Sequence, residues 1–130
     1  MASDDQPRIL AVEDNPETQL LLRHLLRDLY DIVIANGVDE ALTKADDHAF
    51  QLLLLDINLS EQKTGLDLLD MLREKDNTRN AASIALTAYA MPGDRENFLE
   101  AGFDSYLSKP FTRDDLLEVI KSALPSTRPS

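Results

Sequence analysis

Five side chains that could do chemistry together lie where short apolar runs of this 130-residue chain end: three carboxylates, a hydroxyl and an amine. Glu13 and Asp14 follow the first run, Asp56 and Thr87 end the third and fourth, and Lys109 follows the fifth. Carboxylates brought together repel one another unless a cation neutralises them, and oxygen ligands without His or Cys nearby favour Mg²⁺. An aspartate between such a cation and a lysine ammonium is well placed to accept a phosphoryl group.

These residues can act together only if the fold brings the ends of the apolar runs to one place. The runs have the length and composition of β-strands, and amphipathic stretches of helical periodicity separate them. The strands are expected at 8–13, 30–35, 51–56, 83–87 and 105–108. The continuous leucines from Leu52 to Leu55 are typical of a strand buried on both faces, as in a parallel sheet.

Strands alternating with helices predict an α/β fold, specifically a flavodoxin-like, doubly wound, five-stranded parallel sheet with five helices. Ligands of such folds bind at the carboxyl ends of the strands. In the strand order 2-1-3-4-5 the first and third strands are neighbours, so we expect Glu13, Asp14 and Asp56 to converge on one small site.

Local signals predict where several helices begin and end. Asn15 followed by Pro16 is typical of an N-cap and the first helical residue. Gly102 is expected just beyond a helix C-terminus, and Thr112 has the spacing of a capping box that begins the last helix. Leucines at helical spacing predict the apolar face of the first helix: Leu21, Leu22, Leu25, Leu26 and Leu29.

Composition limits the classes of protein that the chain can represent. A net charge of −11 argues against direct binding of nucleic acid, because a phosphate backbone is bound by clustered Lys and Arg. The sequence has no Cys, which excludes disulfides and thiolate metal sites, and no apolar run long enough to cross a membrane. Its polar, acidic start is unlike a secretory signal, so we expect a cytoplasmic protein.

Four segments in order resemble the receiver domain of two-component response regulators, as in the single-domain chemotaxis regulator. They are 9–16 (ILAVEDNP), 54–58 (LLDIN), 85–91 (ALTAYAM) and 102–111 (GFDSYLSKPF). The resemblance covers almost the whole chain, and it implies a polar N-terminal tail at 1–7, a receiver domain at 8–124 and a C-terminal tail at 125–130.

The resemblance implies a role for each residue of the acidic site. Asp56 is expected to be the phospho-acceptor, with Lys109 pairing with the phosphoryl group. Mg²⁺ is expected to bind Asp56 and Asp14 directly, Glu13 mainly through water, and the backbone carbonyl of Asn58.

The resemblance also implies a switch and shows one departure. Thr87 and Tyr106 match the residue pair that reports phosphorylation to a partner-binding surface, and the Lys109–Pro110 bond is expected to be cis. The family usually has proline four residues after the acceptor and glycine eight after it. Here Ser60 replaces that proline and Gly65 comes nine residues after Asp56, so the intervening loop is one residue longer and more polar.

The expected function is a phosphorelay receiver that takes its phosphoryl group from a histidine kinase or a histidine phosphotransfer protein. It then acts on an unknown downstream protein, and it dephosphorylates itself slowly without being a turnover enzyme. Two alternatives are a pseudo-receiver that only binds proteins and a hydrolase of the haloacid-dehalogenase type. The first would be signalled by a degenerate site, and the second prefers its aspartate nucleophile after the first strand, with another Asp where Asn58 stands.

Overall fold

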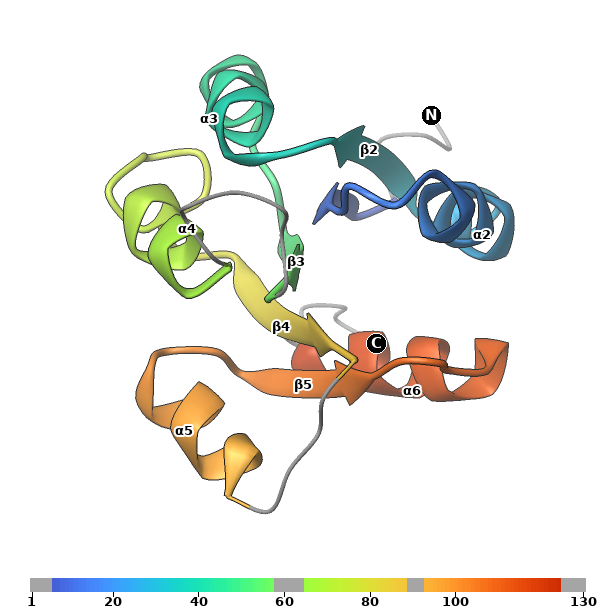
Figure 1. Cartoon of the computed structure of the whole chain (residues 1–130). Coiled ribbons are helices and arrows are strands. Elements are labelled where there is room, and N and C mark those ends of the chain that lie inside the picture. Colours follow the sequence, from blue (N-terminus) through green and yellow to red (C-terminus); the bar gives the residue numbers. More distant parts are fainter. Residues whose placement is uncertain (1–5, 58–64, 89–92, 125–130) are drawn as a thin grey trace, which may run out of the picture.

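The computed structural model describes residues 6–57, 65–88 and 93–124, and Figure 1 shows their arrangement. The strands are β1 (Arg8–Val12), β2 (Asp31–Ala35), β3 (Leu52–Asp56), β4 (Ala82–Thr87) and β5 (Ser105–Ser108). The helices are α2 (Pro16–Leu26), α3 (Val38–Asp47), α4 (Gly65–Leu72), α5 (Asp94–Glu100) and α6 (Arg113–Ala123). Asn58, the loop Ser60–Thr64 and most of both expected tails lie outside the described residues.

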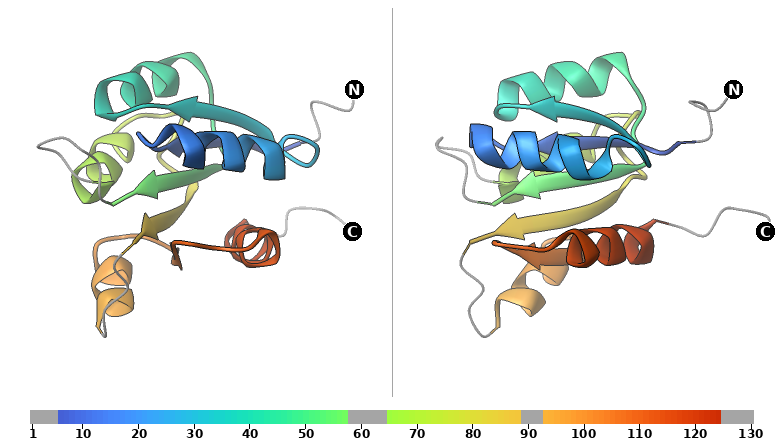
Figure 2. Two further views of the ribbon diagram at one scale, coloured as in Figure 1. Left: turned by 45° about the vertical axis from the view of Figure 1, so that its right-hand side comes forward. Right: turned by 90° about the vertical axis from the view of Figure 1, so that its right-hand side faces the viewer.

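The five strands form one parallel sheet in the order β2-β1-β3-β4-β5, which confirms the predicted topology. The arrowheads visible in the right-hand view of Figure 2 accordingly point the same way. Val12, the last residue of β1, pairs with Leu55 of β3. The residues that follow these two positions, Glu13 and Asp56, therefore leave neighbouring strands at the same level of the sheet.

Helices cover both faces of the sheet: α3, α4 and α5 lie on one side, and α2 and α6 on the other (Figure 1). Side chains of a strand alternate between the two faces. Leu53 and Leu55 therefore pack with α3, α4 and α5, whereas Leu52 and Leu54 pack with α2 and α6, and all four are fully buried. Each such leucine contributes about 1.5–3 kcal/mol by leaving water, so β3 anchors the position of Asp56.

The predicted helix ends are confirmed. The Asn15 side chain accepts hydrogen bonds from the backbone N–H groups of Glu17 and Thr18, and Pro16 is the first residue of α2. Thr112 and Asp115 form the predicted capping box of α6.

The predicted apolar face of α2 is only partly correct. Leu22 and Leu26 are fully buried and Leu25 packs beside them, but Leu21 and Leu29 are each 41% exposed. Leu21 lies one residue, or about 100° of helical turn, before Leu22 and so faces away from the buried stripe. Leu29 lies beyond Leu26, where α2 ends, so helical spacing no longer sets its direction.

Candidate functional site

Three carboxylates meet at the carboxyl edge of the sheet. Side-chain oxygens of Glu13, Asp14 and Asp56 all lie within 4.8 Å of one another. Glu13 is fully buried, Asp56 is 2% exposed, and Asp14 is half-buried. The parallel pairing of β1 with β3 brings these residues together, as the strand order predicts.

Lys109 brings a positive charge to this cluster from the chain that follows β5. Its Nζ donates hydrogen bonds to Glu13 Oε1 at 2.7 Å and to Asp56 Oδ2 at 3.2 Å. Its backbone N–H donates to the carbonyl of Thr87 at 2.8 Å, which ties the residue to the end of β4. The Lys109–Pro110 peptide bond is cis, as expected.

Burial and charge oppose each other in the pKa values of this site. Burial raises the pKa of Glu13 above its ordinary 4.5, although the hydrogen bond from Lys109 acts in the opposite direction. Burial tends to lower the pKa of Lys109, but the hydrogen bond to Glu13 and the charge of Asp56 outweigh it, so that this pKa is raised. The ammonium of Lys109 therefore stays protonated at neutral pH.

The donor set of the cluster fits a hard divalent cation. All three side chains offer carboxylate oxygens, and the ammonium of Lys109 balances only one of the three negative charges when Glu13, Asp14 and Asp56 are ionised. The pKa of Glu13 is raised chiefly because burial penalises its charged carboxylate, and the nearby negative charge of Asp56 adds to this effect.

Two contacts that the sequence analysis did not predict shape the cluster. Gly65 begins α4 directly against Asp56: a Cβ at this position would lie 2.6 Å from the carbonyl oxygen of Asp56. A glycine is by itself only a weak sequence signal that another segment of backbone approaches closely. Gln19 donates from Nε2 to the carbonyl oxygen of Glu13 at 2.5 Å, and no motif in the sequence marks it.

Thr87 and Tyr106 lie on the neighbouring strands β4 and β5. Tyr106 pairs with Ala85, and Thr87 follows two residues later, so both side chains belong to the face covered by α3, α4 and α5. Thr87 is 2% exposed, whereas Tyr106 is half-buried with its ring centroid 5.9 Å from that of Phe98 in α5. Thr87 thus lies at the carboxyl edge of the sheet, where the acidic cluster is, and Tyr106 lies nearer the surface on the same face.

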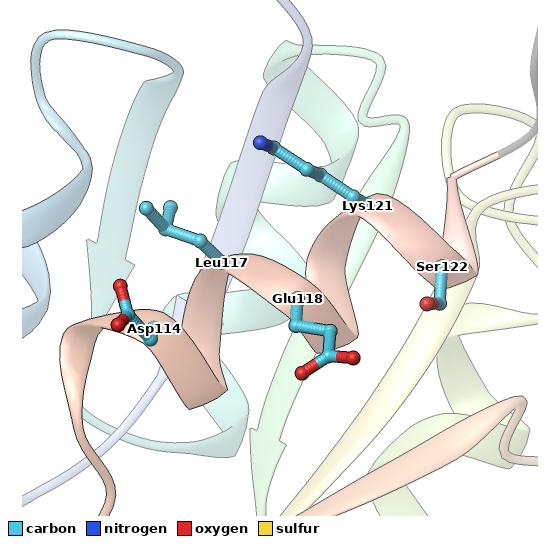
Figure 3. A pocket seen from close by; sticks show the side chains of 5 residues that line it. All are labelled: Asp114, Leu117, Glu118, Lys121 and Ser122. Atoms are coloured by element: carbon cyan, nitrogen blue, oxygen red, sulfur yellow. The ribbon is translucent and has the colours of Figure 1, made fainter.

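A shallow groove on α6 lies apart from this cluster (Figure 3). Its described lining mixes acidic, basic, polar and apolar side chains: Asp114, Leu117, Glu118, Lys121 and Ser122. None of these lining residues is one of the clustered carboxylates or Lys109, so the groove is not part of the candidate site.

Solved structures of other proteins share this fold. Chemotaxis protein CheY4 of Vibrio cholerae matches with a TM-score of 0.84 and 26% identity, over 92% of this chain and 99% of that one. The receiver domain of a sensor histidine kinase of Pseudomonas aeruginosa matches with a TM-score of 0.79 and 35% identity, over 91% and 97% of the two chains. That receiver domain was solved with a magnesium ion coordinated in its active-site cleft.

Proteins with similar sequences are signalling proteins of the same kind as those with similar structures. The polar-differentiation response regulator DivK of Brucella anthropi is 37% identical over 117 residues, which cover 89% of this chain and 94% of DivK. Sensor protein GacS of Pseudomonas syringae is 34% identical over 122 residues; these cover 91% of this chain but only 13% of GacS. Residues 9–121 match the response regulator receiver domain. The chain therefore belongs to the response regulator receiver domain family of two-component systems.

Proposed function

We propose that this receiver accepts a phosphoryl group on Asp56, with Glu13, Asp14 and Lys109 completing the site. The observation that carries the proposal is the position of Asp56 Oδ2. This oxygen lies 3.2 Å from Nζ of Lys109. Asp56 also belongs, with Glu13 and Asp14, to the one group of carboxylates among the described residues that could hold a metal ion.

In the proposed transfer, a carboxylate oxygen of Asp56 attacks the phosphorus of a phosphohistidine. The new O–P bond forms as the N–P bond of the donor breaks, and the histidine nitrogen keeps the electron pair. Lys109 binds an oxygen of the transferred group with its ammonium, which stabilises negative charge where it develops. Because β3 is buried on both faces, Asp56 is held in place during the attack.

The carboxylates of Asp14 and Asp56 would bind Mg²⁺ directly and Glu13 through water, with the backbone carbonyl of Asn58 as a further ligand. When bound, Mg²⁺ neutralises charge on the carboxylates and on the phosphoryl oxygens. Glu13 also holds Lys109, since Glu13 Oε1 accepts the shorter of the two hydrogen bonds from Nζ. Glu13 thereby sets the starting position of the ammonium.

Thr87 and Tyr106 are proposed to report phosphorylation to partners. The hydroxyl of Thr87 would move to bind a phosphoryl oxygen, and the Tyr106 ring would then rotate toward the space that it leaves. The placement of both residues on one face of adjacent strands supports this coupling, and the contact of Tyr106 with Phe98 links it to α5.

We propose a histidine kinase or a histidine phosphotransfer protein as the phosphodonor. GacS is a sensor protein, and the Pseudomonas aeruginosa receiver is a domain of a sensor histidine kinase, which supports this class of partner. A downstream protein would read the switched surface, and a slow self-dephosphorylation would end the signal without enzymatic turnover. No described helix is long and apolar enough to span a membrane, and we propose that the protein acts in the cytoplasm.

The test is to incubate the protein with a small acyl phosphate and Mg²⁺ and to map the modified peptide by mass spectrometry. Asp56→Asn should abolish labelling. The matched control is Asp70→Asn, which makes the same substitution at an exposed position on α4 and should label like the parent. Equal labelling of Asp56→Asn and the parent would show that another residue is the acceptor.

A further inference from the structure

Gln19 links the acidic loop, residues 13–15 between β1 and α2, to the start of α3 through a series of hydrogen bonds. Its Nε2 donates to the carbonyl oxygen of Glu13 at 2.5 Å and to Asn36 Oδ1 at 2.7 Å. Both neighbours are oxygens, so the amide nitrogen must be the atom that faces them. Asn36 in turn donates from its backbone N–H and from Nδ2 to Glu40 Oε1, at 2.7 and 2.9 Å.

These hydrogen bonds complete the set of contacts that hold the side chain and the backbone of Glu13 in place. The Glu13 carboxylate accepts hydrogen bonds from Lys109 Nζ and from the backbone N–H of Asn15. The backbone N–H of Glu13 donates to the carbonyl of Ala35. Its carbonyl is held by Gln19 alone among the contacts that the structure gives it. That carbonyl belongs to the peptide plane between Glu13 and Asp14, so fixing it also fixes the direction in which the Asp14 backbone leaves.

Gln19 is itself firmly placed. Its backbone N–H donates to the carbonyl of Asn15 at 3.0 Å in the first turn of α2, whose N-cap is the Asn15 side chain. Glu40 orients Asn36, since the two N–H groups of Asn36 that bind Glu40 leave Oδ1 free to face Gln19. Three elements thus converge on one peptide plane of the acidic loop: α2, the end of β2 and the start of α3.

We propose that Gln19 is a positioning residue for the Glu13–Asp14 pair, and that Asn36 and Glu40 hold its side-chain amide in the orientation that faces Glu13. The proposal rests on the proposed function of that pair in binding Mg²⁺. Without Gln19 the peptide between the two acids can rotate, and the Asp14 carboxylate samples directions that do not face the cation. Loss of a hydrogen bond that orients metal ligands typically weakens metal affinity by about tenfold or more.

The experiment is a Mg²⁺ titration followed by amide chemical shifts of residues 13–15, well below the melting temperature. Gln19→Met keeps the length and neutrality of the side chain but removes both donors. Leu20→Met is the matched control, because Leu20 follows Gln19 on α2 and is 70% exposed. Asn36→Ala and the Gln19→Met/Asn36→Ala double variant complete a cycle that tests whether the two residues act as one unit.

We expect the dissociation constant for Mg²⁺ to rise about tenfold in Gln19→Met, less in Asn36→Ala, and no further in the double variant. Leu20→Met should bind like the parent. A lower melting temperature of Gln19→Met with unchanged Mg²⁺ affinity would reduce Gln19 to a structural residue and overturn the proposal. Failure of the parent itself to bind Mg²⁺ would instead overturn the proposed metal site, and the inference with it.

Discussion

Gly65 and Asp56 approach each other so closely that no larger residue fits at position 65. A Cβ there would lie 2.6 Å from the carbonyl oxygen of Asp56 and 3.1 Å from the Cα of Ile57. Both obstacles are backbone atoms, which cannot move aside as the end of a flexible side chain can. The first turn of α4 is therefore pressed against the peptide that carries the proposed phospho-acceptor.

Gly65→Ala should lower the free energy of unfolding by about 1–3 kcal/mol, the range for overpacking at a tight site. It should also reduce the rate of Asp56 phosphorylation, because α4 or the end of β3 must shift to make room. Gly93→Ala is the matched control. Its φ of +92° makes alanine strained, but a Cβ there meets nothing within 4 Å. Both variants should lose stability in urea denaturation, but only Gly65→Ala should be labelled more slowly at Asp56. Normal labelling of Gly65→Ala would show that the contact does not position Asp56.

Glu13→Gln should change how stability depends on pH in the absence of Mg²⁺. Burial raises the pKa of Glu13, so the folded state binds this proton more tightly than the unfolded state does. The free energy of unfolding of the parent should consequently fall as the pH rises from 4.5 through the raised pKa. Glu13→Gln removes this titration, and its stability in the presence of a chelator should fall less over the same window.

The control for this prediction is Glu17→Gln, at an exposed position in the first turn of α2. It should keep the pH dependence of the parent and its gain in melting temperature on addition of Mg²⁺, whereas Glu13→Gln should lose most of that gain. If chemical denaturation gives Glu13→Gln and the parent the same pH profile, burial of Glu13 is not what opposes its ionisation.

Thr87→Ala should separate phosphorylation from signalling. The variant keeps Asp56 and Lys109 and should still bind beryllofluoride at Asp56, but it lacks the hydroxyl that would bind a phosphoryl oxygen. Coupling between two such sites is typically about 1–3 kcal/mol, and most of it should be lost. The measurement is the change in amide chemical shifts over residues 93–124 when beryllofluoride is added. Thr43→Ala, on the exposed face of α3, should respond like the parent. A full response of Thr87→Ala would place the coupling elsewhere.

The parts of this molecule that could be predicted are those that local pattern and strand order determine. Leu52–Leu55 indicated a strand buried on both faces, and Asn15–Pro16 indicated a helix start, because each signal depends on a few adjacent residues. The meeting of Glu13 with Asp56 followed from the parallel order of β1 and β3.

The parts that could not be predicted depend on distances between segments. Helical spacing placed Leu21 and Leu29 on the apolar face of α2, but the direction of the buried stripe and the end of the helix are set by packing on the sheet. The contact of Gly65 with Asp56 and the reach of Gln19 to Glu13 depend on loop and helix positions that no spacing encodes. The hydrogen bond between Lys109 and Glu13 likewise appears only in three dimensions.

The most direct test of the proposed site is a crystal structure of the protein with Mg²⁺ and beryllofluoride, which mimics a bound phosphoryl group. We expect beryllium bonded to a carboxylate oxygen of Asp56, with Mg²⁺ contacting Asp14 and Asp56. Lys109 Nζ, now 3.2 Å from Asp56 Oδ2, should contact a fluorine, and the hydroxyl of Thr87 should contact another. Beryllofluoride bound away from Asp56, or a cation bound away from these carboxylates, would contradict the proposed function of the site.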